Sequence, residues 1–192
     1  MKYLYYPGCS LEGTALEYNA STQAIMEELE MDLLELKNWT CCGAGAAEAT
    51  SHLLSLALPA YILAMAEEMD GTKEILVPCS GCYLNLKKVE KKSRKDPELL
   101  NKINSILQEK KVRFHGRVNV RHLLDVVARD AGPEKIVSRV KNPLIDLNIA
   151  SYYGCQCLRP YAVFDDPEVP RSMEPLIESV GAKVHPWNMG GR

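Results

Sequence analysis

The sequence predicts an α/β fold: a module built on a parallel sheet with helices on both faces, followed by the first part of a second, similar module. Three observations support this prediction. Short apolar runs alternate with longer stretches of helical periodicity through the first half of the chain, an order typical of parallel strands joined by right-handed crossovers. Cysteines come just after several of the predicted strands. The opening pattern then returns near residue 147, which indicates an internal repeat.

The opening of the chain predicts a strand followed by a helix. Residues 2–6 are an aromatic and apolar run that Pro7-Gly8 ends, as is typical of a strand that stops at a turn. Apolar side chains then recur at helical spacing to about residue 30. Cys9 is therefore expected just beyond the C-terminal end of the first strand.

Two further strands are predicted, and cysteines follow each of them. The segment 32–39 leads to Cys41 and Cys42 and then to a loop of small residues, 43–47, that lets the backbone approach a bulky group closely. A long helix leads to the third strand, 74–77. Because the carboxyl ends of parallel strands border one crevice, we expect the cysteines after all three strands to come together.

The middle of the chain is predicted to be helical. Asp96-Pro97 starts a helix with a good cap, a further helical stretch covers about 120–140, and 141–143 reads as a linker. We therefore expect a first module with a helical extension at 1–141 and an incomplete second module at 142–192.

The second module is expected to repeat the order strand, helix, strand. The predicted strands are 147–153 and 182–187, with a helix at 170–179 between them. Tyr152-Tyr153-Gly154-Cys155 is similar to Tyr5-Tyr6-Pro7-Gly8-Cys9, so Cys155 is the repeated cysteine. The chain ends about where a second Cys-Cys pair would be expected.

Composition bears on partners and location. The 192 residues carry 23 basic and 25 acidic side chains, a formal charge of -2, so no overall field favours nucleic acid or an anionic membrane. The most apolar stretch, 53–66, is too short to cross roughly 30 Å of hydrocarbon. The start lacks the pattern of a signal peptide, and we expect a cytoplasmic protein without a transmembrane segment. Its seven cysteines are then expected to stay reduced.

Five cysteines form the candidate site: Cys9, Cys41, Cys42, Cys79 and Cys82. Soft thiolates favour iron-sulfur clusters, zinc or copper. Zinc needs four ligands, commonly two short-spaced pairs, whereas this set has a lone cysteine, an adjacent pair and one Cys-x-x-Cys. An iron-sulfur cluster is the favoured interpretation. Structural zinc, and dithiol redox chemistry at Cys79-Ser80-Gly81-Cys82, are the alternatives.

The remaining reactive residues receive no ligand role, and no catalytic residue is predicted. Cys157 has no counterpart in the first module and is expected to be a small buried hydrophobe. The lysine-rich stretch 87–95 is expected to be a solvated helix face, with docking to an acidic partner subunit as the alternative. Four histidines lack ligand spacing and are expected to be structural or on the surface: His52, His115, His122 and His185.

These motifs together resemble the B subunit of heterodisulfide reductase, which is built from two cysteine-rich CCG modules. The matching stretches span nearly the whole chain: Tyr5-Tyr6-Pro7-Gly8-Cys9-Ser10-Leu11-Glu12-Gly13-Thr14-Ala15, Trp39-Thr40-Cys41-Cys42-Gly43-Ala44, Val77-Pro78-Cys79-Ser80-Gly81-Cys82-Tyr83-Leu84-Asn85 and Tyr152-Tyr153-Gly154-Cys155. Broader relatives include thiol:fumarate reductase and iron-sulfur subunits of enzymes that oxidise glycolate, lactate and glycerol 3-phosphate. The first of the four stretches favours the heterodisulfide reductase subunit.

The resemblance implies a cofactor, a reaction and partners. A complete module would hold a noncubane 4Fe-4S cluster through its five cysteines, and Cys155 would open a second, incomplete set. The reaction would be reduction of the coenzyme M/coenzyme B disulfide to two thiols, in methanogenesis-type energy metabolism. Cluster iron would take the thiolates formed, and partner iron-sulfur and flavin subunits would deliver the electrons.

The chain departs from this pattern because its second module lacks the Cys-Cys and Cys-x-x-Cys elements. Two functions therefore stand beside each other. One is the catalytic subunit of a CoB-CoM heterodisulfide reductase, truncated in the second module and not expected to cleave the disulfide efficiently by itself. The other is a non-catalytic iron-sulfur carrier, or a CCG subunit of another oxidoreductase. Substrate-dependent thiol release would distinguish a catalytic subunit from a carrier.

Overall fold

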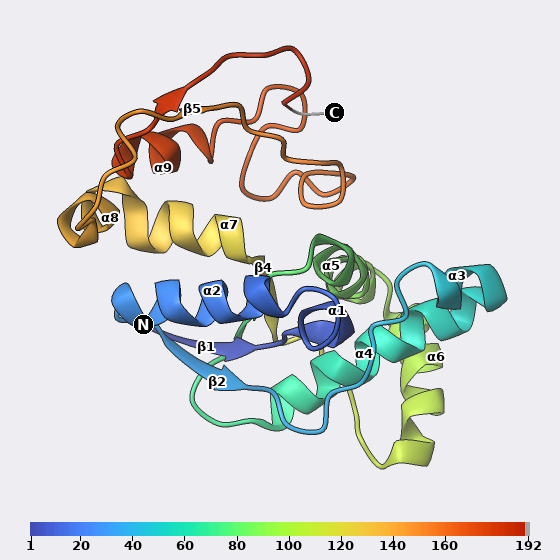
Figure 1. Cartoon of the computed structure of the whole chain (residues 1–192). Helices are drawn as coiled ribbons and strands as arrows, with labels where there is room; N and C mark the ends of the chain where they lie inside the picture. Colours follow the sequence, from blue (N-terminus) through green and yellow to red (C-terminus); the bar gives the residue numbers. More distant parts are fainter. Residues whose placement is uncertain (191–192) are drawn as a thin grey trace. The chain divides into compact units, whose positions relative to one another are not determined.

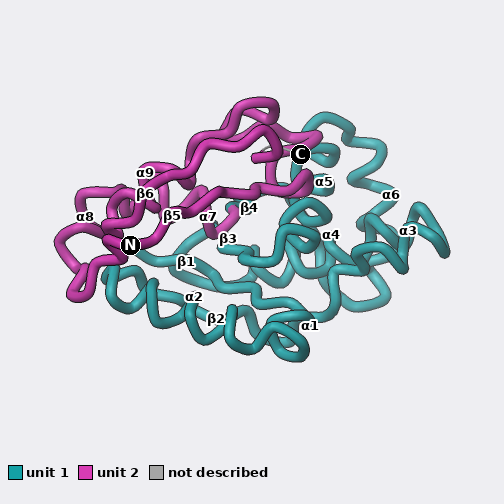
Figure 2. Tube along the Cα trace, turned by 45° about the horizontal axis from the view of Figure 1, so that its top comes forward, with its two compact units in different colours: residues 1–121 teal, residues 122–192 magenta. Residues whose placement is uncertain are grey.

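The computed structural model describes residues 1–190 and divides the chain into two compact units, Met1–Arg121 and His122–Arg192 (Figure 2). This division falls inside the stretch that the sequence assigned to the helical extension of the first module, and a module boundary near residue 141 stays a prediction. Among residues 1–190, the helices are all too short or too polar to serve as a membrane span.

Unit 1 is built on a four-stranded sheet in the order β2-β1-β3-β4. β1 runs parallel to both β2 and β3, with Tyr5 opposite Glu35 on one side and Leu76 on the other. The expected α/β class with a parallel sheet is confirmed. The strands are β1 Lys2–Tyr5, β2 Asp32–Glu35, β3 Glu74–Val77 and β4 Asn119–His122.

The strand order explains why helices cover both faces of this sheet. The chain moves outward from β1 to β2 and then returns past β1 to β3, and right-handed crossovers in opposite directions place their helices on opposite faces. Accordingly α2 lies on one face and α4 on the other (Figure 1). The connection from β3 to β4 continues in the same direction as that from β2 to β3. Its helices α5 and α6 pack against α4.

The helices of unit 1 differ in length and in burial. α4 is apolar on nearly every side and contains the buried Pro59. β1 and β3 are largely buried, as is typical of parallel strands covered on both faces. The helix bounds are α1 Gly8–Leu11, α2 Leu16–Glu28, α3 Ala46–Thr50, α4 His52–Glu68, α5 Ser80–Lys95, α6 Pro97–Leu107 and the 3-10 turn η1 Gln108–Lys110.

Two sequence expectations are corrected in this unit. The strand predicted at 32–39 ends at Glu35, because Asn38 takes a left-handed backbone conformation with φ 55° that turns the chain. The helical stretch predicted from about residue 120 begins instead with β4. The Val120 backbone N–H donates to Glu90 Oε2 at 2.9 Å, so contacts distant in sequence override the local helical pattern.

Unit 2 contains a smaller parallel pair, β5 Asn148–Ile149 with β6 Lys183–Val184. The helix α9, Glu174–Ser179, lies between them in sequence, so the order β5-α9-β6 repeats that of β1-α2-β2 in the same parallel sense. The strands are shorter than predicted. Three helical segments precede β5 in sequence: α7 Leu123–Val126, the π-helical stretch η2 Val127–Ala131 and α8 Gly132–Arg139.

Candidate metal centre

All five cysteines singled out in the first module follow the carboxyl ends of strands in unit 1. Cys9 lies in α1 directly after β1, and Cys41 and Cys42 lie in the loop after β2. Cys79 is the N-cap of α5 after β3, with Cys82 in the first turn of that helix. The strand order reverses between β1 and β3, which is where open α/β sheets bind their ligands.

The sulfurs approach one another in two pairs. Cys9 Sγ is 3.7 Å from Cys41 Sγ, and Cys42 Sγ is 3.3 Å from Cys82 Sγ. Cys79 lies three residues before Cys82, at the N-cap of the same helix. Cys42 and Cys82 are buried, whereas Cys9 and Cys41 are exposed. The site therefore has a buried floor and a rim that faces solvent.

Hydrogen bonds among the sulfurs shift their pKa values in opposite directions. The interaction with Cys82 lowers the pKa of Cys42 to about 7 and that of Cys79 to about 5, although burial opposes both changes. These two interactions, with burial, raise the pKa of Cys82. The hydrogen bond with Cys41 raises the pKa of Cys9. Because the thiolate is the form that binds metal, Cys42 and Cys79 are favoured as ligands near neutral pH.

Tyr6 positions the loop that carries the adjacent cysteines. Its side chain is fully buried, and its hydroxyl donates to the Thr40 carbonyl at 2.8 Å, one residue before Cys41. Its ring meets Trp39 edge to face, with centroids 5.4 Å apart. Burial raises the pKa of Tyr6, and four of the site cysteines raise it further. Tyr6 therefore lies beneath the sulfurs as a neutral hydrogen-bond donor.

Two glycines allow the backbone to come close to the sulfurs. A Cβ added at Gly8, where φ is +73°, would lie 2.9 Å from Cys82 Sγ. At Gly43, where φ is +75°, it would lie 2.8 Å from side-chain atoms of both Ala47 and Leu58. Only glycine tolerates this backbone conformation and this spacing together. The loop is therefore tightly packed at Gly43, and its approach to a bulky group stays a prediction.

The chemistry of the donor set fits an iron-sulfur cluster. Within residues 1–190, no three His, Cys, Asp or Glu side chains are grouped closely enough to hold a single metal ion. The candidate donors are thiols throughout, which is the ligand type that cluster iron takes. They follow the ends of three strands, where Gly8 leaves room beside the Cys82 sulfur. The residues present therefore fit a group with several irons.

Cys155 and Cys157 lie in unit 2. Cys155 is exposed, and its carbonyl accepts from the Arg159 N–H at 2.8 Å in a turn. Cys157 is buried, as expected, and its Sγ donates to the Tyr153 carbonyl at 3.0 Å. The histidines also have the expected character. His122 caps α7 by accepting the Leu124 N–H on Nδ1, and the other three are exposed.

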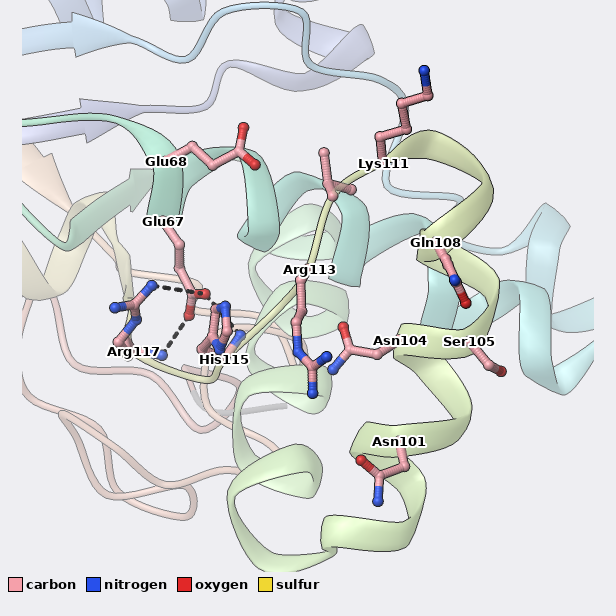
Figure 3. A pocket seen from close by; sticks show the side chains of 11 residues that line it. Glu67, Glu68, Asn101, Asn104, Ser105, Gln108, Lys111, Arg113, His115 and Arg117 are labelled. Carbon is pink, nitrogen blue, oxygen red and sulfur yellow. Dashed lines mark hydrogen bonds and ion pairs between the residues drawn. The ribbon is translucent and has the colours of Figure 1, made fainter.

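A separate polar pocket of about 530 Å³ lies where α4, α6 and the segment after α6 meet (Figure 3). Its central group is the buried Glu67, whose carboxylate accepts the backbone N–H groups of His115 and Arg117 at 2.7 and 2.5 Å. These bonds anchor the chain that leads into β4. No cysteine of the described residues lines this pocket.

Three residues that touch the site were not singled out from the sequence. Asn85 Nδ2 donates to the Cys42 carbonyl at 3.2 Å, Ser10 hydrogen-bonds to Cys79, and Tyr6 supports the loop before Cys41. Asn85 stands three residues after Cys82, a spacing that places both on one face of a helix. That spacing is the signal that would have identified it.

The cysteines of this site lie in a stretch that matches a known family. Residues 3–87 match the CCG family model, described as a cysteine-rich domain, and this range includes all five cysteines. The chain is 35% identical over 97% of its length to the 8-methylmenaquinol:fumarate reductase membrane anchor subunit of Wolinella succinogenes. It is 31% identical over 92% of its length to the B subunit of the Ferredoxin:CoB-CoM heterodisulfide reductase of Methanosarcina mazei.

The chain therefore contains a CCG cysteine-rich domain at residues 3–87 and is similar to the B subunit of heterodisulfide reductase. It spans 64% and 59% of the two curated relatives named above. Among solved structures, a hypothetical protein from Helicobacter pylori matches with a TM-score of 0.74 at 14% identity, over 100% of this chain and 34% of that one. That likeness shows the fold alone.

Proposed function

We propose that the chain is an iron-sulfur subunit of a reductase and that unit 1 holds one noncubane 4Fe-4S cluster. The ligands would be Cys9, Cys41, Cys42, Cys79 and Cys82. The observation that carries the proposal is that thiols from three strand ends gather at one edge of the sheet, in pairs 3.7 and 3.3 Å apart. Cys155 is proposed to open a second ligand set in the second module.

The favoured substrate is the disulfide of coenzyme M and coenzyme B, reduced to two thiols. The names of the two Methanosarcina relatives contain this substrate. When bound, the cluster would supply iron with affinity for thiolate sulfur and a route for electrons. The chain's own contribution is placement: buried Cys42 and Cys82 would anchor the group, while exposed Cys9 and Cys41 leave a rim that substrate can reach.

A second candidate is a subunit of a fumarate reductase or of another CCG-containing oxidoreductase. The Wolinella relative supports it, with 35% identity over 97% of this chain. Either function would require partner subunits, and we propose iron-sulfur and flavin proteins for that role. We propose the cytoplasm as the location, since its reducing thiol pool keeps such cysteines free to bind metal.

Metal analysis tests the proposal directly. Iron, acid-labile sulfide and zinc are measured per chain on anaerobically purified protein. An electron paramagnetic resonance spectrum is then recorded after oxidation with coenzyme M present. We expect about four irons with matching sulfide and a signal that depends on the thiol. Zinc alone, or no metal, would contradict the proposed cluster.

The substrate distinguishes the two candidates. The chemically reduced protein is mixed with the heterodisulfide, and released thiols are counted against a sample without substrate. Thiol release supports the heterodisulfide function. Iron without thiol release supports a carrier or a subunit of another oxidoreductase.

A further inference from the structure

Asn85 is a buried amide one helical turn beyond Cys82. It lies on α5 with 8% of its surface exposed, and its Nδ2 donates to the Cys42 carbonyl at 3.2 Å. Burying an amide is costly unless it is hydrogen-bonded. This bond joins the loop after β2 to the helix after β3.

The same helix holds Cys42 at two points. Cys82 lies 3.3 Å from the Cys42 sulfur, and Asn85 holds the Cys42 carbonyl. The next residue, Gly43, packs so tightly that it has no room for a Cβ. The position of the Cys42 sulfur therefore depends on α5 as well as on its own loop.

We propose that Asn85 is a positioning residue that places the Cys42 sulfur opposite Cys82 by holding the Cys42 carbonyl. The placement is a property of the folded chain itself. Its effect on a bound cluster rests on the proposed function, since groups that orient a metal ligand influence metal affinity and reduction potential.

The first test uses metal-free protein. The oxidant diamide converts two neighbouring thiols into a disulfide and is itself reduced to the hydrazine. Mass spectrometry of a digest gives the ratio of Cys42–Cys82 to Cys9–Cys41 bridges, and the second pair is the internal reference. We expect Asn85→Ala to lower this ratio about fivefold, the factor that one lost buried hydrogen bond corresponds to. Asn85→Asp keeps the shape of the side chain but lacks the N–H donor, so it should lower the bridge ratio as Asn85→Ala does.

Asn104→Ala is the matched control. It removes two amide hydrogen bonds of 2.9 Å to the backbone of Phe114, a loss comparable to that in Asn85→Ala but on α6. We expect it to lower stability without changing the bridge ratio. An unchanged ratio in Asn85→Ala, or an equal change in Asn104→Ala, would overturn the inference for the folded chain.

The second test uses iron-loaded protein. We expect Asn85→Ala to lose iron to a chelator about tenfold more readily than the wild type. Its cluster potential should also shift, because the Cys42 sulfur is no longer held in place. Asn104→Ala should shift neither. If the wild-type protein binds no iron, the proposed function fails. The bridge ratio in metal-free protein still tests whether Asn85 places the Cys42 sulfur. Iron bound with unchanged chelation and potential would overturn the effect on the cluster.

Discussion

The cysteines of the candidate site fall into a buried pair and an exposed pair. Cys42 and Cys82 have 1% and 3% of their surface exposed, so the surrounding core holds them. Cys9 and Cys41 are exposed and are held by each other and by Tyr6 below the loop. The buried pair would resist exchange with solvent thiols, whereas the exposed pair is open to solvent.

Removal of one ligand should be measurable as lost iron. Cys42→Ala, like Cys41→Ala, should remove most of the iron bound per chain, because each deletes a thiolate ligand of the proposed cluster. Iron analysis on anaerobically purified variants measures this. Cys157→Ala changes a buried cysteine of unit 2 and should keep the wild-type iron content. Full iron in Cys42→Ala would rule out the five-ligand assignment.

Cys79 should stay reactive at a lower pH than an ordinary thiol. Its pKa is lowered to about 5, mainly by the hydrogen bond with Cys82, so it is a thiolate at and above neutral pH. In metal-free protein, its alkylation by iodoacetamide should remain fast down to roughly pH 6 and slow only near its pKa. Peptide mapping measures the rate at each pH. A rate that falls tenfold per pH unit below about pH 8 would contradict the lowered pKa.

At the scale of elements, the junction between β1 and α1 depends on Gly8. Gly8→Ala would force a left-handed backbone on alanine, at about 1 kcal/mol, and would press a methyl group against the Cys82 sulfur, 2.9 Å away. We expect lower stability and lower iron retention. Denaturant unfolding and iron analysis measure the two effects.

Gly116→Ala is the control for backbone strain. Gly116 has a similar φ of +77°, but an added Cβ would only meet Arg94 Cγ at an ordinary 3.8 Å. Gly116→Ala should therefore lower the stability of the protein and leave its iron content unchanged. Equal iron in the two variants would show that the Gly8 clash relaxes without moving Cys82.

The helix α5 contributes a buried charge pair as well as two cysteines. Lys87 Nζ lies 2.8 Å from Glu90 Oε2, and both side chains are almost fully buried. The solvated face expected for 87–95 therefore does not include Lys87. Glu90 also receives Arg94 and the Val120 N–H, so this carboxylate attaches β4 to the helix.

Glu90→Ala should destabilise unit 1 by about 3–5 kcal/mol, because it leaves a buried lysine uncompensated. Urea unfolding measures the loss. Glu48→Ala removes the exposed partner of Lys88, 3.5 Å away, and should cost at most about 1 kcal/mol. Similar losses in the two variants would contradict the structural role of the buried pair.

At the scale of the whole molecule, unit 1 contains the β2-β1-β3-β4 sheet up to Arg121 and all five candidate ligands. We therefore expect residues 1–121, expressed alone, to fold and to bind as much iron per chain as residues 1–192. Circular dichroism and iron analysis measure the two properties. A folded fragment without iron would show that the centre requires unit 2.

The expected α/β fold was predictable because its signals are local. β3 occupies the predicted 74–77, and Asp96 caps α6 as the Asp-Pro pair indicated. β4 was missed because its four residues adjoin a helix, and its backbone is held by Glu90, 30 residues away in sequence. A local pattern carries no information about such a partner.

The sequence by itself determined the thiol donor set, its place after three strands and the parallel α/β class, because side-chain chemistry and periodicity are properties of neighbouring residues. Only the tertiary structure decided that Cys42 pairs with Cys82, that Cys9 pairs with Cys41, and that Asn85 reaches the Cys42 carbonyl. These contacts join residues more than 30 positions apart, and the crossovers of the sheet determine which of them meet.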